Sequence, residues 1–283
     1  MDSFFYLLRH FFTHKDFLPP AQQLAGTLFT PLHFAFSAVV LCVVIGSALY
    51  VSHHKKLIKP VFTAVWAVMV VWEFVIVAWE SLSGSVAQLD LQTNLSLYPC
   101  SIFLYVMPLA IWGKGRLKQM ACGYVCTLGL LGAAINFVYP ATRLSFYSCI
   151  SFPGFHTFSF HGSMLFVCLV MLLSGYHRYR DVSDWKDLFL PCVPTLLLSI
   201  PANLVNYSAI GADYMFFRGQ LPIIASLTGH TTELRTTIIL YVFYIIMPAL
   251  FYLPAYMKQL HHEPVYMEID LDEEIEYWAE TQM

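Results

Sequence analysis

Charged residues are scarce in this sequence. Lys, Arg, Asp and Glu make up 12% of the 283 residues, whereas a soluble domain carries about 25%. The mean hydropathy is +0.62, and the apolar residues are gathered in blocks along the chain. So little charge cannot cover a soluble protein of this length, and the composition therefore indicates a protein that contacts lipid.

The sequence also lacks the short motifs of several large enzyme classes. It contains no GxSxG, no HExxH, no Walker motif and no GxGxxG. Its cysteines are seven in number, form no CxxC pair and lie mostly within apolar blocks, which argues against a disulfide framework. We expect no cofactor, no bound metal and no nucleic-acid partner, and protein partners are not predictable from the sequence.

The apolar blocks have the length of membrane-spanning helices. A block of about 20 residues, at 1.5 Å each, crosses a hydrocarbon core of roughly 30 Å. Barrel strands would alternate apolar and polar residues, and these blocks do not. The sequence predicts an all-α, polytopic membrane helix bundle with about seven transmembrane helices. The predicted spans are residues 27–51, 60–80, 95–113, 117–139, 155–175, 188–209 and 236–257.

The spans divide the chain into three parts. Residues 1–25 mix aromatic, apolar and basic side chains, which predicts a short interfacial helix. Residues 26–258 form the seven-helix transmembrane domain. Residues 259–283 form an acidic tail, which we expect in the cytosol. The long connection 210–235 is expected to be functional or partly re-entrant.

The basic residues predict the orientation. Ten of the 15 Lys and Arg residues lie in the first, third and fifth loops or after the last span. The positive-inside rule then places the N-terminus outside and the C-terminus in the cytosol. This multi-pass protein would lie in the plasma membrane of a bacterium or in the endoplasmic reticulum of a eukaryote.

Polar side chains inside the spans point to a site, because they are costly in hydrocarbon and usually face a cavity or a partner. Under the predicted orientation, those of spans two, three, five and six all fall in the outer half of the membrane. We expect them to line one polar cavity, although hydrogen bonds that merely join helices are the alternative. The cavity candidates are Glu73, Glu80, Asn94, Ser96, Cys100, His156, His161, Asn203 and Asn206.

A cysteine and a histidine in one cavity suggest nucleophilic catalysis. A thiolate is the nucleophile, and a nearby imidazole accepts the thiol proton. A carboxylate or amide then orients the imidazole, and Glu73 and Asn206 are the candidates for that role. Asn94, Ser96 or backbone amides at the start of span three are candidates for stabilising an oxyanion. From these residues alone, ordinary packing of a membrane cysteine remains the alternative.

Three segments resemble the YwaF-like membrane proteins, a group that includes the transmembrane protein 164 branch. LSLYPCSI at 95–102 resembles the start of the third span of that branch, with its Pro-Cys pair at Pro99 and Cys100. LGAAINFVYP at 131–140 resembles a Gly-Ala helix that ends in Pro. FHTFSFHGSML at 155–165 resembles the aromatic segment whose histidine corresponds to His161. A fourth segment, 206–222, departs from the bacterial pattern at Asp213 and Gln220.

The resemblance implies a catalytic role for two residues. In the transmembrane protein 164 branch, the Pro-Cys cysteine and the span-five histidine are regarded as catalytic in moving a fatty acyl chain between phospholipids. They correspond to Cys100 and His161. We therefore expect a cysteine-dependent phospholipid acyltransferase, or an acyl hydrolase, that works through an acyl-thioester. Its substrates would be a phospholipid and a lyso-phospholipid, and His161 would also activate the second hydroxyl. The Cys100 sulfur and a His161 ring nitrogen should lie within about 5 Å.

Two other functions fit the same residues. A transporter or ligand-binding protein would use the polar cavity without covalent chemistry, with Glu73 and His161 as proton carriers. A metal site built from Cys100, His156 and His161 is weaker, because residues five apart diverge by about 140° around a helix.

Overall fold

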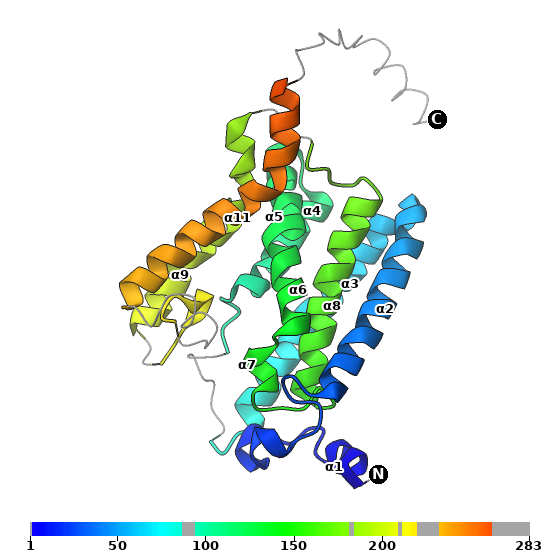
Figure 1. Cartoon of the computed structure of the whole chain (residues 1–283), viewed down its shortest axis with the longest axis vertical. Helices are drawn as coiled ribbons and strands as arrows, with labels where there is room; N and C mark the ends of the chain where they lie inside the picture. The colour runs from blue at the N-terminus through cyan, green and yellow to red at the C-terminus, as the bar shows by residue number, and fades with distance from the viewer. Residues whose placement is uncertain (1, 87–93, 181–183, 209–210, 220–231, 262–283) are drawn as a thin grey trace.

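The structure, a computed structural model, is helical. It describes the chain except for residues 1, 87–93, 181–183, 209–210, 220–231 and 262–283 (Figure 1). The described residues form α-helices, short 3-10 turns and one π-helical turn, and they contain no strand. The prediction of a polytopic helical bundle is confirmed. The acidic tail at 259–283 lies almost wholly outside the described residues.

Six helical stretches are long and apolar enough to cross a membrane. Each matches a predicted span within a few residues at the start and end of its apolar block. They are α2 (Pro31–His53), α3 (Lys55–Ser83), Gly115–Leu144, α8 (Phe152–Leu173), Trp185–Ser208 and Glu233–Gln259. The third comprises α5 (Gly115–Tyr124), a π-helical turn (Val125–Gly129), α6 (Leu130–Val138) and α7 (Ala141–Leu144). The fifth ends in α9 (Val193–Ser208), and the sixth lies in α11 (Glu233–His261).

The predicted span 95–113 is shorter than expected. Its apolar helix runs only from Pro99 to Trp112, as a 3-10 turn (Pro99–Ser101) followed by α4 (Ile102–Trp112). A residue before proline is disfavoured in helical conformation, and Tyr98 is extended, with φ −84° and ψ 159°. The helix covers about 21 Å at 1.5 Å per residue, less than a hydrocarbon core. In the non-helical chain before Pro99, the side chains of Leu95, Leu97 and Tyr98 pack against the core of the bundle.

Helix α8 forms the centre of the bundle. Of its 22 residues, 15 are buried, whereas α2 buries 6 of 23. In Figure 1, α8 lies between α6 on one side and α2 and α3 on the other, and its closest packing is against these helices. The large apolar side chains on the outer faces of α2, α3 and α11 are exposed, as expected of surfaces that contact lipid tails.

The π-helical turn lies beside the start of α4. Tyr124, the residue before this turn, donates its hydroxyl to the Pro99 carbonyl. The turn widens the helix by one residue, an irregularity often found near functional sites. A tyrosine hydroxyl from the third long span thus contacts the backbone next to Cys100.

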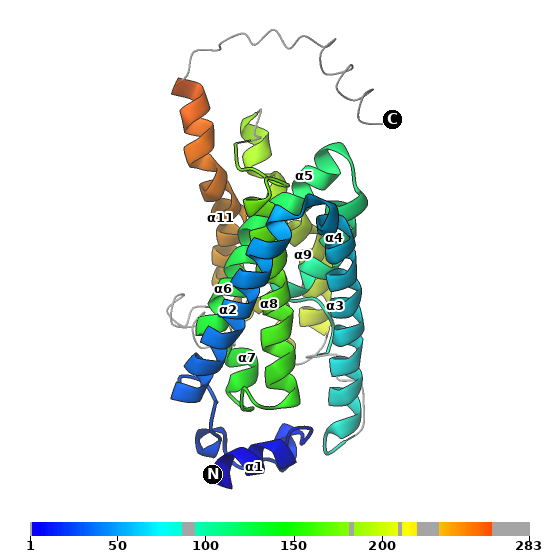
Figure 2. The same ribbon diagram turned by 90° about the vertical axis from the view of Figure 1, so that its right-hand side faces the viewer.

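The two ends of the bundle differ in composition. In both views α1 (Asp2–Arg9) lies at one end, and α11 ends at the other (Figures 1 and 2). At the α1 end, Asp16 accepts the Ser85 backbone N–H at 2.9 Å, which lowers the pKa of that carboxyl group. The basic loops meet at the far end, where Lys118 lies 4.3 Å above the Tyr176 ring. Such a gathering is what the positive-inside rule predicts for one face of a membrane protein.

Candidate functional site

Three predicted cavity residues meet around one carboxylate. Glu73 comes from α3, Ser96 from the chain before α4, and His156 from the first turns of α8. Ser96 Oγ donates to Glu73 Oε1 at 2.7 Å. On the other side, His156 Nε2 lies 3.6 Å from Glu73 Oε2. The predicted convergence of spans two, three and five is thus seen at Glu73.

The second histidine of α8 has a defined tautomer. His161 Nδ1 lies 2.8 Å from the Thr157 carbonyl oxygen, one turn earlier in the same helix. A carbonyl only accepts hydrogen bonds, so Nδ1 carries the proton in the neutral ring and Nε2 keeps its lone pair. We expected Glu73 or Asn206 to orient this ring, but the helix backbone does so. Among the described hydrogen bonds, none engages His161 Nε2.

Cys100 differs from the other cysteines in its surroundings. It occupies the middle of the 3-10 turn before α4 and is partly exposed. Cys42 is exposed on α2, and the other five thiols are buried. Cys100 also lies within electrostatic range of the Glu73 carboxylate. It is therefore the thiol that combines access with neighbouring polar groups.

Cys100 and His161 do not form a hydrogen bond in the described part of the chain. The expected separation of about 5 Å between the sulfur and a ring nitrogen stays a prediction. Catalytic hydrogen bonds are often long in substrate-free enzymes and shorten when the substrate binds. The two side chains come from elements that both adjoin Glu73, because Ser96 precedes Cys100 by four residues and His156 precedes His161 by five.

The predicted asparagines have other partners. Asn206 Oδ1 accepts the Tyr214 backbone N–H at 2.7 Å, and Asn206 Nδ2 donates to the Tyr214 carbonyl at 2.9 Å. Asn203 Nδ2 donates to the Tyr241 hydroxyl at 2.9 Å, on α11. Asn94 Nδ2 lies 3.4 Å from Ser81 Oγ, near the end of α3. The asparagines of α9 therefore hold the Tyr214 backbone and α11, and no hydrogen bond among the described residues joins them to Glu73.

An arginine that was not predicted as a site residue lies close to this group. Arg143, in α7, forms an ion pair with Glu80 on α3. It also acts electrostatically on Glu73. In the sequence Arg143 is one of the five Lys and Arg residues that lie neither in the basic loops nor after the last span. The available signal was Glu80 itself, because a carboxylate within a span requires a partner.

A metal site receives no support from the geometry. Within the described ranges, no group of three His, Cys, Asp or Glu side chains lies close enough to hold a metal ion. His156 and His161 are five residues apart on α8, and the Nδ1 atom of His161 is already bonded to a carbonyl. Cys100, His156 and His161 therefore do not form the metal site considered above.

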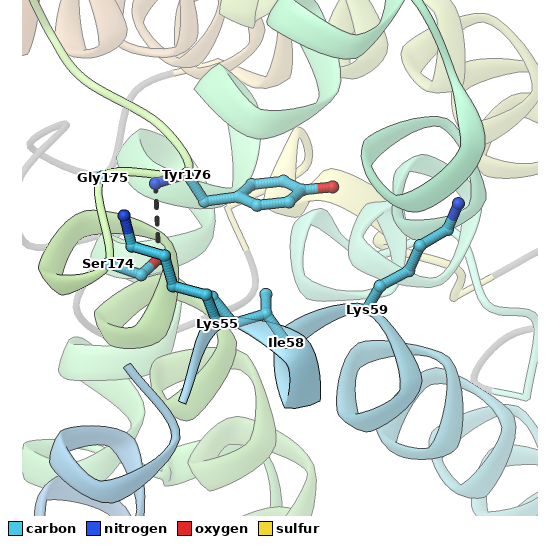
Figure 3. Close-up of a pocket in the computed structure, with 6 residues that line it drawn as sticks. All are labelled: Lys55, Ile58, Lys59, Ser174, Gly175 and Tyr176. Atoms are coloured by element: carbon cyan, nitrogen blue, oxygen red, sulfur yellow. Dashed lines mark hydrogen bonds between the residues drawn. The ribbon is translucent and has the colours of Figure 1, made fainter. Parts of the chain in front are cut away.

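A hollow of about 230 Å³ lies at the opposite, basic end of the bundle. It is lined by the start of α3 and the turn after α8 (Figure 3). Figure 3 shows the Lys55 ammonium group near Ser174, whereas Lys59 extends past the Tyr176 hydroxyl. The two cations thus diverge around the ring and do not converge on a single anion.

Comparison with known proteins relates the chain to one family. Residues 28–254, well over half of the chain, match the TMEM164 family. The matched range contains every residue of the site, from Glu73 to His161. No curated protein and no solved structure matches the chain.

Proposed function

The chain belongs to the TMEM164 family, and on this premise we propose that it is a membrane-embedded lipid acyltransferase. Its nucleophile is Cys100 and its base is His161. The substrates are a phospholipid, which donates the acyl chain, and a lyso-phospholipid, which accepts it. The six long apolar helices hold the site within the membrane, where both substrates reside.

The observation that carries the proposal is the hydrogen bond from His161 Nδ1 to the Thr157 carbonyl. It leaves Nε2 as the basic atom of a buried imidazole. A base of this kind, oriented by a third group, is what activation of a thiol requires. Cys100 is partly exposed and lies in the turn that begins the helix. The Ser101 N–H is bonded to the Tyr98 carbonyl, which leaves the Cys100 N–H as the backbone candidate for stabilising an oxyanion.

The first half of the reaction uses these two residues. His161 Nε2 takes the thiol proton, and the Cys100 sulfur attacks the ester carbonyl carbon of the phospholipid. The ester C–O bond breaks, and His161 returns the proton to the leaving oxygen. A lyso-phospholipid departs and an acyl-thioester remains on Cys100. Attack by a second hydroxyl then releases the acyl chain and restores the thiol.

The orientation follows from the charge of the loops. The N-terminus lies outside and α11 ends in the cytosol, because the basic loops gather at the α11 end. Glu73, His156 and the start of α4 then face the outer leaflet, from which the lipid enters.

Intact-mass spectrometry of the purified protein in vesicles of labelled phospholipid tests the proposal. Wild type should gain one acyl chain through a bond that hydroxylamine cleaves, as a thioester requires. Cys100→Ala should gain none, and Cys42→Ala is the matched control, because Cys42 is exposed on α2 and should behave as wild type. His161→Ala should slow acylation about 100-fold or more. Acyl transfer that persists in Cys100→Ala would contradict the proposal.

A transporter is the second candidate, favoured by the buried His156 beside Glu73. Ionisable pairs within a bundle are typical of proton-coupled transport. Such a protein would acquire no acyl chain, and an imposed pH gradient would drive solute into sealed vesicles. Glu73→Gln would abolish this uptake, whereas Cys100→Ala would leave it intact.

A further inference from the structure

His156 presents an unpartnered nitrogen to a carboxylate. Its side chain is 8% exposed, and Nε2 is buried without a hydrogen-bond partner. Glu73 Oε2 is 3.6 Å away, beyond the usual limit of about 3.2 Å for an N–H···O bond. Leaving a buried polar atom unpaired is unfavourable. The unpaired Nε2 atom of His156 therefore suggests that a ligand group binds there.

The surroundings hold the pair in position. Ser96 Oγ fixes the other carboxylate oxygen of Glu73 at 2.7 Å. The Trp72 ring lies 5.9 Å from the His156 ring, and the indole N–H donates to Ser159 Oγ on α8 at 2.8 Å. Neither Glu73 Oε2 nor His156 Nε2 is therefore easily turned away from the other.

The chemistry of the two atoms matches a hydroxyl group. An oxygen can lie about 2.8 Å from both atoms at once. With the proton of the neutral His156 ring on Nε2, this oxygen would accept a hydrogen bond from Nε2–H and donate its own proton to Glu73 Oε2. An alcohol does both, whereas an ammonium group only donates and a phosphate dianion only accepts.

We propose that Glu73 and His156 bind the hydroxyl of the acyl acceptor and that Glu73 removes its proton. This inference rests on the proposed function and assigns the second half of the reaction to a base other than His161. The acceptor is an alcohol carried by a lipid, in keeping with the position of Glu73 on a helix that spans the membrane.

In the second half of the reaction, one bond forms as another breaks, and the proton passes through Glu73. The acceptor oxygen forms a bond to the acyl carbonyl carbon, while the bond from that carbon to the Cys100 sulfur breaks. The hydroxyl proton moves to Glu73 Oε2. Glu73 then passes this proton to the departing Cys100 thiolate, which lies within electrostatic range of Glu73. His161 serves only the first half, in which the thiol proton passes to the leaving lyso-lipid.

The two halves are separable in an experiment. Protein is first acylated with labelled phospholipid, freed of excess lipid, and then mixed with lyso-phospholipid while loss of the label from Cys100 is followed. Glu73→Gln should still acquire the acyl chain on Cys100 from the labelled phospholipid, because His161 serves that half of the reaction. Its transfer to lyso-phospholipid should be slower by about 100-fold or more. His156→Leu should behave similarly, and His156→Gln, which keeps an N–H donor, should recover part of the rate.

Asn203→Ala provides the control, because Asn203 contacts Tyr241 on α11 and should transfer at the wild-type rate. A measurement on wild type alone avoids any folding defect of the variants. Two competitors are compared: the parent lyso-phospholipid and an analogue whose acceptor hydroxyl is replaced by hydrogen. The analogue should inhibit transfer at least about tenfold more weakly than the parent. Equal inhibition by the two compounds overturns the inference.

The remaining outcomes separate the inference from the function on which it rests. Normal acylation with transfer unaffected by Glu73→Gln overturns the inference alone. Release of the label only as free fatty acid, at a rate independent of lyso-phospholipid, also overturns it, because the acceptor is then water. Absence of any wild-type adduct on Cys100 overturns the proposed function and the inference together.

Discussion

At the scale of single residues, the seven cysteines differ mainly in access. Cys42 faces outward from α2 and Cys100 is partly exposed, whereas Cys122, Cys126 and the other three are buried. Thiols buried in apolar surroundings are inert, because the thiolate is the reactive form and burial disfavours it. The reactivity of the cysteines should therefore follow their burial.

Alkylation of the folded protein by N-ethylmaleimide tests this difference. Cys42 and Cys100 should be modified in mild detergent, and the other five only after unfolding. Cys100→Ala should gain one adduct fewer, as intact mass reports, and Cys42→Ala serves as its control. Modification of Cys122 or Cys126 ahead of Cys100 would contradict the burial seen in the structure.

The polar residues of the site were predictable as a set but not in their contacts. The spacing of Glu73, Ser96 and His156 along three spans placed them at one depth, and the structure joins them. Asn203 and Asn206 were grouped with them by the same reasoning, yet they bond α11 and the Tyr214 backbone. Depth follows from position in a span, whereas direction depends on how each helix is rotated.

At the scale of elements, one ion pair ties α3 to α7. The side chains of Glu80 and Arg143 are 12% and 27% exposed, so the loss of either leaves the other charge poorly solvated. Breaking a buried pair costs about 3–5 kcal/mol, whereas replacing both partners costs much less. The pair should therefore behave as a unit.

A double-variant cycle tests this coupling. Arg143→Met should lower the free energy of unfolding by about 3 kcal/mol, and adding Glu80→Gln should restore much of the loss. Unfolding in mild detergent, followed by tryptophan fluorescence, reports both effects. Additive losses from the two substitutions would show that the charges do not interact.

The chain after α9 is held by Asn206. The segment contains a short 3-10 turn (Tyr214–Phe216), in which Met215 has a positive φ of 61°. The side chains of Tyr214 and Met215 are fully buried. A left-handed residue other than glycine or asparagine is strained, so tertiary contacts must impose this conformation. The paired bonds from Asn206 to Tyr214 are such contacts.

Asn206→Ala should therefore destabilise the protein. It removes both hydrogen bonds to the buried Tyr214 backbone, at about 1–3 kcal/mol for each. Asn203→Ala, which removes one bond to a tyrosine hydroxyl, should cost about 1 kcal/mol. Thermal unfolding in the same detergent compares them, and equal losses would argue against the special role of Asn206.

At the scale of the whole molecule, the charge of the loops and the path of the helices agree. The basic loops meet at the end of the bundle where α11 finishes, and α1 lies at the other end (Figure 1). The proposed orientation assigns the α11 end to the cytosol.

A tag after residue 283 measures the orientation. In sealed vesicles whose cytosolic face is outward, an added protease should remove this tag and leave a tag before residue 1 protected. Inverted vesicles should give the opposite pattern. Removal of the N-terminal tag from cytosolic-face-out vesicles would reverse the orientation and place Glu73 in the inner leaflet.

The sequence alone determined the membrane environment, the helical class and the places of the spans. These properties are local, because an apolar block long enough to cross the hydrocarbon core must satisfy its own backbone as a helix. The Pro-Cys and aromatic-histidine segments likewise indicated the transmembrane protein 164 family, and the match over residues 28–254 confirms this prediction.

Which polar groups meet depends on how the helices pack in three dimensions. Hydropathy along 95–113 did not reveal that the helix begins at Pro99. Nor did it show that Thr157 sets the His161 tautomer, or that His156 faces Glu73 without a bond. Periodicity places a side chain on one face of its own helix. The neighbour that this face contacts depends on the packing and rotation of all the helices together.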